Sequence, residues 1–276
     1  MEKVDRLGWA AGISFKSYGV KIGIRSNVQE GVDRALSYLP HHHDIVEVPT
    51  VDRLYSIIVG GAGQRKNVRR FNLLYSNHIR IARSMDLEEV YERFESDLRL
   101  FVAEVTKHRV FVHAGVVGWK GKAIVIPGRS YFGKSTLVSE LVKAGATYYS
   151  DEYAVFDARG RVHPFPKPLE MRDEGQFKQT KVGVEDFGGR TATKPIPVGL
   201  VMVTKYKAGA NWRPRPLSGG QGVLELLANT VSARRQPEKA MGTLQKAVSA
   251  AQVLKGVRGE AERLIPSIFS SLEKNT

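Results

Sequence analysis

The sequence predicts an α/β protein with a mixed sheet, preceded by an N-terminal α+β lobe. An apolar run at 123–126, a glycine-bounded loop at 128–135 and a segment with helical spacing at 136–143 follow one another as strand, loop and helix. A second apolar run at 110–117 stands directly before them, across Gly118-Trp119-Lys120-Gly121, which is the pattern of a hairpin. Because hairpin strands are antiparallel, we expect the sheet to contain both strand directions.

A long amphipathic helix at 86–105 separates this core from the preceding residues. Asp86 and Glu89 form a D-x-x-E variant of the capping box at its start, and its apolar stripe indicates a structural role. We therefore divide the chain into an N-terminal α+β lobe at 1–105 and a core domain at 106–276. Within the lobe we expect strands at 18–25, 54–59, 71–75 and 79–82 and a helix at 27–39, with 54–59 and 71–75 paired across the Gly60-Gly61 loop.

The composition is that of an ordinary globular protein, with 276 residues, 42% hydrophobic and 25% charged. The chain contains no cysteine, which excludes disulfides and thiolate chemistry. No apolar stretch approaches the roughly 20 residues that span a bilayer. The first residues, Met1 to Arg6, include acidic side chains and no apolar run follows, so we expect no secretory signal and a cytoplasmic protein.

The net charge of +14 is the unusual feature of the composition. Nucleic-acid-binding proteins concentrate such charge in runs with aromatic platforms, whereas here the Lys and Arg residues are dispersed. The densest patch, at 65–70, falls in a loop that flanks a strand. A nucleic-acid partner is therefore not expected. The run from His41 to Asp44 also predicts a solvated turn, since adjacent residues cannot all face one metal ion.

The 128–135 loop has the G-x-x-x-x-G-K-[ST] spacing of a phosphate-binding loop. Its glycines allow backbone N–H groups to converge on phosphate oxygens, and the helix that follows adds its positive dipole end. Lys134 would reach the β- and γ-phosphates and Ser135 would hold Mg²⁺, which predicts ATP with magnesium. A glycine turn that merely joins strand to helix is the alternative. The residues expected to contact the nucleotide are Gly128, Arg129, Ser130, Tyr131, Phe132, Gly133, Lys134, Ser135 and Thr136.

Two adjacent carboxylates, Asp151 and Glu152, interrupt the β-prone run at 147–156. A buried carboxylate is costly unless it is paired or holds a metal, so Asp151 beside a triphosphate would accept a hydroxyl proton or bind magnesium. A polar strand edge is the alternative. Glu170 is a second candidate metal ligand, with a surface position as its alternative, and His113 alone would be a structural histidine.

The remaining core predicts a hairpin turn at 158–161 with a return strand at 162–165, and a polar, glycine-rich loop at 173–195. A buried strand follows at 198–206. Helices at 222–234 and 237–254 would cover the sheet, with a short helical tail after 259.

Five stretches together resemble the catalytic domain of HPr kinase/phosphorylase and its HPr-kinase-like relatives, over about 108–205. The resemblance implies a fold akin to ATP-dependent phosphoenolpyruvate carboxykinase, ATP with Mg²⁺, phosphorylation of a protein serine, and a homo-oligomer. The stretches are His113-Ala114-Gly115-Val116-Val117, the 128–135 loop, Leu141-Val142-Lys143-Ala144-Gly145, Ser150-Asp151-Glu152 and Leu169-Glu170-Met171-Arg172.

The resemblance also implies roles for single residues. Lys134 would bind phosphate, Asp151 would be the general base, and His113 would line the site. Metal ligation would fall to Ser135, with Glu170 and Glu152. The chain departs from the family at two positions. Tyr131 stands where the family's loop usually has glycine, and Glu152 stands where the family has a second aspartate. Residues 1–105 do not resemble the N-terminal domain of the bacterial enzyme.

The sequence therefore predicts a kinase that transfers the γ-phosphate of ATP to a hydroxyl of a protein or peptide. A small-molecule kinase would use the same residues. A nucleotide-binding regulatory module without phosphoryl transfer is the alternative from another class, and Tyr131 and Glu152 are its motivation.

Overall fold

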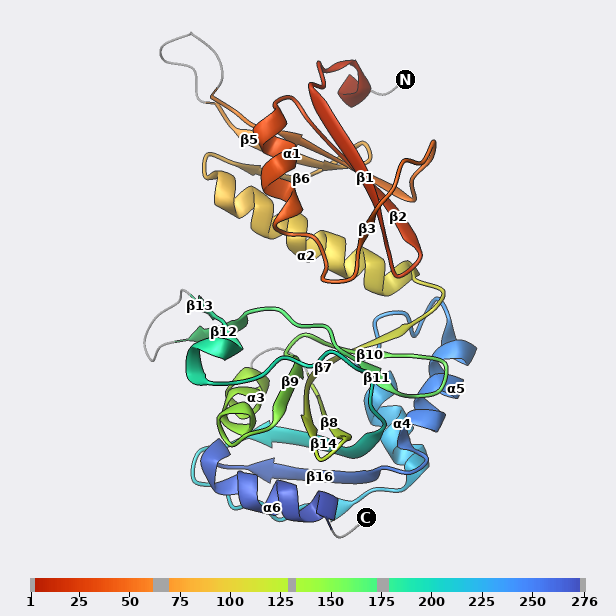
Figure 1. The fold of residues 1–276 in the computed structure, drawn as a ribbon. Coiled ribbons are helices and arrows are strands. Elements are labelled where there is room, and N and C mark those ends of the chain that lie inside the picture. The colour runs from red at the N-terminus through yellow and green to blue at the C-terminus, as the bar shows by residue number, and fades with distance from the viewer. Residues whose placement is uncertain (1–2, 62–69, 129–132, 173–178, 274–276) are drawn as a thin grey trace. The chain divides into compact units, whose positions relative to one another are not determined.

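The computed structural model describes residues 3–61, 70–128, 133–172 and 179–273, and at 3, 170–172 and 179–181 it describes the backbone alone. Contacts divide the chain into two compact units, Met1–Lys107 and His108–Thr276 (Figure 1). The sequence predicts a division between 105 and 106, close to this point. Each unit has a hydrophobic core of its own.

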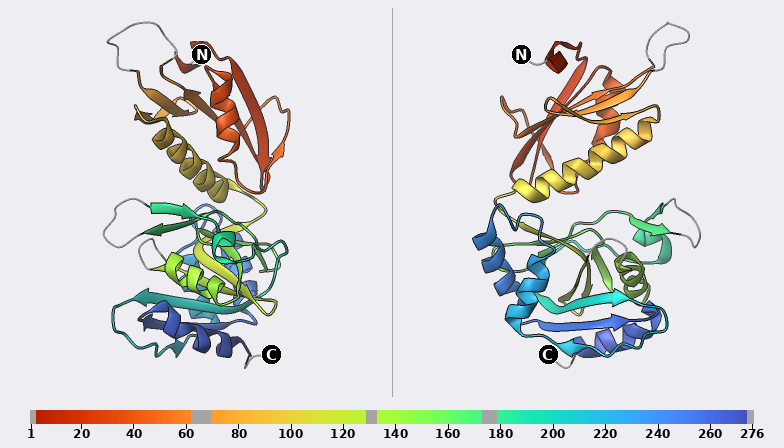
Figure 2. Two further views of the ribbon diagram at one scale, coloured as in Figure 1. Left: turned by 60° about the vertical axis from the view of Figure 1, so that its left-hand side comes forward. Right: turned by 180° about the vertical axis from the view of Figure 1, so that it is seen from behind.

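The first unit is a six-stranded sheet in the order β3-β1-β2-β4-β5-β6, with one face covered by two helices (Figure 2). The strands β4 and β5 pair antiparallel, as predicted, and β6 pairs with β5. The elements are η1 (Lys3–Arg6), β1 (Ala11–Ser17), β2 (Val20–Ser26), α1 (Gln29–Leu36), β3 (Asp44–Ile45), β4 (Arg53–Ile58), β5 (Asn72–Ser76), β6 (Ile79–Ser84) and α2 (Leu87–Val105).

The helix α2 follows the prediction closely, but its cap differs from the expected capping box. The Asp86 carboxylate accepts a hydrogen bond from the backbone N–H of Glu88 at 2.8 Å. Glu89 does not reach back to the backbone of Asp86. Instead the Ser84 hydroxyl donates to the Glu89 carboxylate and accepts from the Asp86 N–H at 3.0 Å. Ser84 thus bridges the two ends of the motif.

The second unit is an eight-stranded mixed sheet in the order β11-β10-β7-β8-β14-β16-β15, with β9 also paired to β7. β7 and β8 form the predicted antiparallel hairpin, whereas β8, β14 and β16 run parallel. The predicted mixed sheet is thereby confirmed. The strands are β7 (Val110–Trp119), β8 (Lys122–Pro127), β9 (Thr147–Ser150), β10 (Tyr153–Phe156), β11 (Val162–His163), β14 (Val198–Tyr206), β15 (Arg215–Pro216) and β16 (Gln252–Arg258), and a separate pair is β12 (Leu169–Arg172) with β13 (Gln179–Val182).

Helices cover both faces of this sheet, which makes the unit a three-layer α/β structure. Val112, Ala114 and Val116 of β7 pack with α4 and α5, while Val117 packs with α3 and α6. Figure 2 shows the two helix layers on opposite sides of the strands. The helices are α3 (Lys134–Lys143), η2 (Val184–Phe187), α4 (Gly219–Leu227), α5 (Pro237–Val248) and α6 (Ala261–Glu273).

The two helices predicted at 222–234 and 237–254 are both too long. α4 ends at Leu227 because the next residues bond to β7, with the Val231 N–H donating to the Phe111 carbonyl at 2.9 Å. α5 ends at Val248, and the strand β16 follows in parallel pairing with β14. In both places pairing with a distant strand outweighs the local helical pattern.

Other boundaries differ less. The run at 147–156 forms two strands, β9 and β10, with a turn at 151–152, and the return strand at 162–165 shortens to β11. The segment at 173–195, expected as a loop, includes β13 and η2. The predicted strand at 198–206 is confirmed as β14. Within the described ranges, no helix has the length and apolar character needed to cross a membrane.

Candidate functional site

The candidate site lies at the middle of β7. At this level the pairing of β7 with its neighbouring strand is interrupted on both sides. β8 pairs with the second half of β7 and ends at Pro127, opposite Ala114. The Gly128 N–H then donates to the carbonyl of His113 at 3.2 Å, and the chain leaves the sheet. The 128–135 loop therefore starts from the level of His113.

The other neighbour of β7 breaks at the same level. β9 pairs with β7 up to the partners Val116 and Ser150, and β10 resumes the pairing at His113 and Tyr153. Asp151 and Glu152 occupy the interruption. The Ser150 hydroxyl accepts hydrogen bonds from the N–H groups of Glu152 at 3.2 Å and Tyr153 at 3.0 Å, which stabilises this turn.

The described part of the 128–135 loop begins at Gly128 and resumes at Gly133. Gly133 has a φ of 75°, in the left-handed region, and its carbonyl accepts the first helical bond of α3, from the Leu137 N–H at 3.2 Å. This conformation favours glycine. The first-turn N–H groups of α3 consequently have no partner within the helix, which is the arrangement that binds anions. Arg129, Ser130, Tyr131 and Phe132 lie outside the described residues.

Lys134 and Asp151 approach each other beside Gly115 of β7. An added Cβ at Gly115 would lie 3.9 Å from Asp151 Oδ1 and 3.9 Å from Lys134 Cβ. It would also lie only 2.6 Å from Val138 Cγ2, so the absence of a side chain lets α3 pack closely on β7. Both Lys134 and Asp151 are buried, each with 8% of its surface exposed.

Burial lowers the pKa of the Lys134 ammonium, and the charge of Asp151 partly offsets that effect. A cation and a carboxylate thus share a poorly hydrated space at the start of α3. Electrostatic interactions are stronger in such surroundings than in water. This pair can attract an anionic group and accept a proton from a neighbouring hydroxyl.

His113 lies at the edge of the same site. Its Nδ1 is 2.9 Å from the carbonyl oxygen of Glu152. Burial lowers the pKa of His113, and the positive charge of Lys134 lowers it further, while the hydrogen bond to the Glu152 backbone acts in the opposite direction. The imidazole is therefore neutral at pH 7.

The structure describes the side chains of two of the three predicted metal ligands, Ser135 and Glu152. Ser135 is half-buried in the first turn of α3. The Glu152 carboxylate faces Lys167, whose Nζ lies 3.5 Å from Oε2. Glu170 lies in β12, and its side chain is outside the described residues. No group of three or more His, Asp or Glu side chains suited to a metal ion occurs among the described residues, so the magnesium ligands remain a prediction.

Arg258 also lies at the site, although the sequence does not predict it there. It is the last residue of β16, only 2% exposed, and its Nη2 donates to the carbonyl of Gly133 at 2.6 Å. Ligand sites in open α/β sheets lie outside the carboxyl ends of parallel strands. That rule points to Arg258 once its strand is known, but the sequence predicts a helix and a loop where β16 lies.

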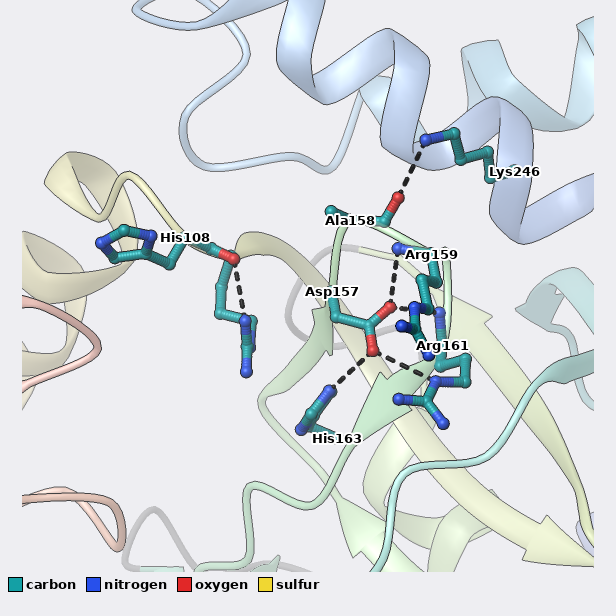
Figure 3. A network of polar contacts seen from close by, with 8 residues as sticks. His108, Asp157, Ala158, Arg159, Arg161, His163 and Lys246 are labelled. Carbon is teal, nitrogen blue, oxygen red and sulfur yellow. Dashed lines mark hydrogen bonds and ion pairs between the residues drawn. The ribbon is translucent and has the colours of Figure 1, made fainter.

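A second polar cluster surrounds Asp157 at the β10–β11 turn (Figure 3). Its carboxylate accepts from the N–H groups of Arg159 at 2.9 Å and Arg161 at 3.0 Å, and from His163 Nε2 at 3.0 Å. Burial alone raises the pKa of Asp157, but these hydrogen bonds lower it to about 2. Every bond serves the turn itself, which makes the cluster structural.

A cavity of about 400 Å³ lies at the hairpin end of β7 and β8. Its walls come from the hairpin, from β9 and from 190–196, and none of the site residues predicted from the sequence lines it. The cavity is therefore separate from the site at the middle of β7. Its lining residues are Gly118, Lys120, Gly121, Thr147, Tyr149, Arg190, Thr191, Ala192, Thr193, Lys194 and Ile196.

No known family model matches the chain, and no curated protein matches it. Among solved structures, the chain is similar to the Hpr(Ser) kinase/phosphatase from Coxiella burnetii, at 15% sequence identity. The match covers 59% of this chain and 94% of that chain, with a TM-score of 0.32. A likeness this distant does not assign the chain to a family, and the resemblance to phosphoenolpyruvate carboxykinase stays a prediction.

Proposed function

We propose that the unit His108–Thr276 is an ATP-dependent kinase that transfers a phosphoryl group to a hydroxyl of a protein or peptide, as HPr-kinase-like enzymes do. The observation that carries this proposal is the meeting of Lys134 and Asp151 beside Gly115, at the mouth of the 128–135 loop. A cation for the phosphates and a base for the acceptor are two of the groups that a kinase supplies for phosphoryl transfer.

In this proposal the first-turn N–H groups of α3 and the Lys134 ammonium hold the β- and γ-phosphates. Asp151 accepts the proton of the acceptor hydroxyl. The oxygen of that hydroxyl bonds to the γ-phosphorus, while the bond between the γ-phosphorus and the ADP oxygen breaks. His113 stays neutral and fixes the turn that presents Asp151, through its bond to the Glu152 carbonyl. Magnesium, when bound, would neutralise charge on the phosphates, with Ser135 as the described residue best placed to hold it.

One observation favours a second function, a nucleotide-binding regulatory module without phosphoryl transfer. The carboxylate of Glu152 already has a cation beside it, since Lys167 Nζ lies 3.5 Å away. A metal ion at Glu152 would have to displace that contact. If Glu152 holds no metal ion, nucleotide binding would be affected less than phosphoryl transfer.

Incubation of the protein with γ-labelled ATP and magnesium, with and without extract of its host cells, tests the proposal. Label on a protein band supports a protein kinase, and label on a small acceptor supports a small-molecule kinase. Nucleotide binding with no labelled acceptor supports the regulatory module. Absence of nucleotide binding would overturn all three.

A further inference from the structure

Arg258 is a buried cation that forms no ion pair with a described carboxylate, although the charge of Glu260 acts on it from nearby. It is 2% exposed, and among the described residues none of its nitrogens forms an ion pair. Its Nη1 donates to the Gly259 carbonyl at 2.9 Å and its Nη2 to the Gly133 carbonyl at 2.6 Å, whereas its Nε has no described acceptor. A guanidinium stays charged in proteins, so this buried charge is stabilised by two carbonyl dipoles and by the nearby charge of Glu260.

The position of the guanidinium is closely defined by the chain around it. An added Cβ at Gly133 would lie 2.5 Å from Arg258 Nη2. The ring of Tyr206 lies on another side, 5.4 Å from Arg258 Cζ, and the Tyr206 hydroxyl donates to Glu260 Oε1 at 2.9 Å. Because β14 and β16 pair in parallel with Tyr206 opposite Arg258, both side chains belong to the same edge of the sheet.

The contact fixes one peptide plane in the 128–135 loop. The carbonyl of Gly133 and the N–H of Lys134 belong to the same peptide, and no peptide in the described chain is cis. In a trans peptide the carbonyl and the N–H point in opposite directions. Holding the Gly133 oxygen against Arg258 therefore turns the Lys134 N–H away from Arg258, toward the start of α3 where an anion would bind.

We propose that Arg258 is a positioning residue of the phosphate-binding loop. It locks the Gly133–Lys134 peptide in the orientation that aims the Lys134 N–H at a phosphate, and its buried charge favours a polyanion over water in that place. This inference rests on the proposed function, since it assigns the loop a triphosphate ligand. Arg258 needs no contact with the ligand for this role.

The first test measures binding of two probes, Mg·ATP and inorganic tripolyphosphate, by titration calorimetry. We expect Arg258→Met to raise the Kd for both probes by about tenfold or more, the effect of losing a hydrogen bond from a charged donor. Arg258→Lys keeps the charge but not the planar fork, so it should fall between the wild type and Arg258→Met. Wild-type affinity for tripolyphosphate in both variants would overturn the inference.

Lys239→Met is the matched control. Lys239 is also a partly buried cation bonded to a backbone carbonyl, that of Arg109, at 3.1 Å. Its replacement removes a comparable hydrogen bond outside the 128–135 loop. The Kd for both probes should therefore stay within about twofold of the wild-type value. A loss of affinity as large as that of Arg258→Met would show that the effect is general destabilisation and would overturn the inference.

A measurement without ligand separates this inference from the proposed function. Amide hydrogen exchange of Lys134 and Leu137 should be faster in Arg258→Lys and Arg258→Met than in the wild type, and unchanged in Lys239→Met. If the wild type binds neither probe, the proposed function fails, and the inferred role in binding fails with it. If the wild type binds both probes but exchange is the same in all four proteins, only the role of Arg258 fails.

Discussion

The Nδ1 atom of His113 lies 2.9 Å from the carbonyl oxygen of Glu152, and this distance fixes the tautomer of the imidazole. A carbonyl oxygen only accepts hydrogen bonds, so Nδ1 carries the proton and donates it. The Nε2 atom of the neutral ring is then left with its lone pair. His113 therefore donates a hydrogen bond to the backbone through Nδ1 and can accept one through Nε2.

We expect His113 to titrate below the ordinary histidine value of 6.5, because burial and the charge of Lys134 both lower its pKa. The neutral ring is the form that the fold favours. Its contribution to stability is therefore complete above about pH 6.5 and is lost as pH falls through the pKa of the folded protein. Nitrogen-15 NMR of the ring would check this. A proton on Nε2 at pH 7, or titration at 6.5 or above, would contradict it.

Replacement of Lys134 by alanine should weaken binding of Mg·ATP by roughly ten- to a hundredfold, the scale of a lost charge-assisted hydrogen bond. Lys143→Ala is the control on the same helix, since Lys143 is exposed and its Nζ contacts Glu140 at 2.6 Å. Calorimetric titration gives both affinities. Equal affinities in the two variants would show that Lys134 does not bind the phosphates.

Replacement of Asp151 by asparagine keeps the shape of the side chain and removes its basicity. We expect transfer of the γ-phosphate to fall by about 10²- to 10⁴-fold, the usual contribution of general base catalysis. Nucleotide affinity should change by no more than a few fold, since Asp151 lies beside Lys134 and not in the loop. Single-turnover transfer measured beside calorimetry separates the two effects. Full activity in Asp151→Asn would exclude Asp151 as the base.

Replacement of Gly115 by alanine should destabilise the second unit by about 1–3 kcal/mol, the cost of inserting a carbon into a packed core. The new Cβ would lie 2.6 Å from Val138 Cγ2. Val138→Ala removes that atom, so the double variant should lose less stability than the two single variants together. Urea unfolding of all four proteins measures this coupling. Additive effects would show that Gly115 and Val138 do not meet.

Replacement of Asp157 by asparagine should cost about 2 kcal/mol at pH 7, because its pKa is lowered from 3.8 to about 2 in the folded chain. A carboxylate with a lowered pKa stabilises the fold above about pH 4, and this stability is lost as pH falls toward 2. The difference between wild type and variant should therefore shrink over that interval. Unfolding curves at several pH values would record it, and a difference independent of pH would contradict the assignment.

The elements that the sequence predicts well are those whose pattern is local. The hairpin β7–β8, the helix α2 and the strand β14 each show their own periodicity. β16 does not, since Gln252-Val253-Leu254 continues the apolar spacing of α5, and only its parallel pairing with β14 makes it a strand. The end of α4 is set in the same way by the bond between Val231 and Phe111.

In the candidate site, too, the features with a local pattern can be predicted from the sequence and those set by distant contacts cannot. Lys134 and Asp151 could be selected from the sequence, because a glycine-bounded loop and a carboxylate in an apolar run are visible there. Their place in one site follows from the family resemblance, but their meeting beside Gly115 could not be predicted, since it depends on Gly115 admitting α3 against β7. Arg258 carries no local signal, because only the strand β16 places it at the carboxyl end of the sheet. Its contact with the Gly133 carbonyl joins residues 125 positions apart in the chain.

Both flanks of the site are attached to one strand, and this has a consequence for motion. Gly128 is bonded to the carbonyl of His113, and the Ala114 N–H donates to the carbonyl of Glu152 at 3.1 Å. A small slide or tilt of β7 would carry the loop and the carboxylate together. We therefore expect thermal displacements of Gly128 and Glu152 to be correlated, so that their separation varies less than the position of either one.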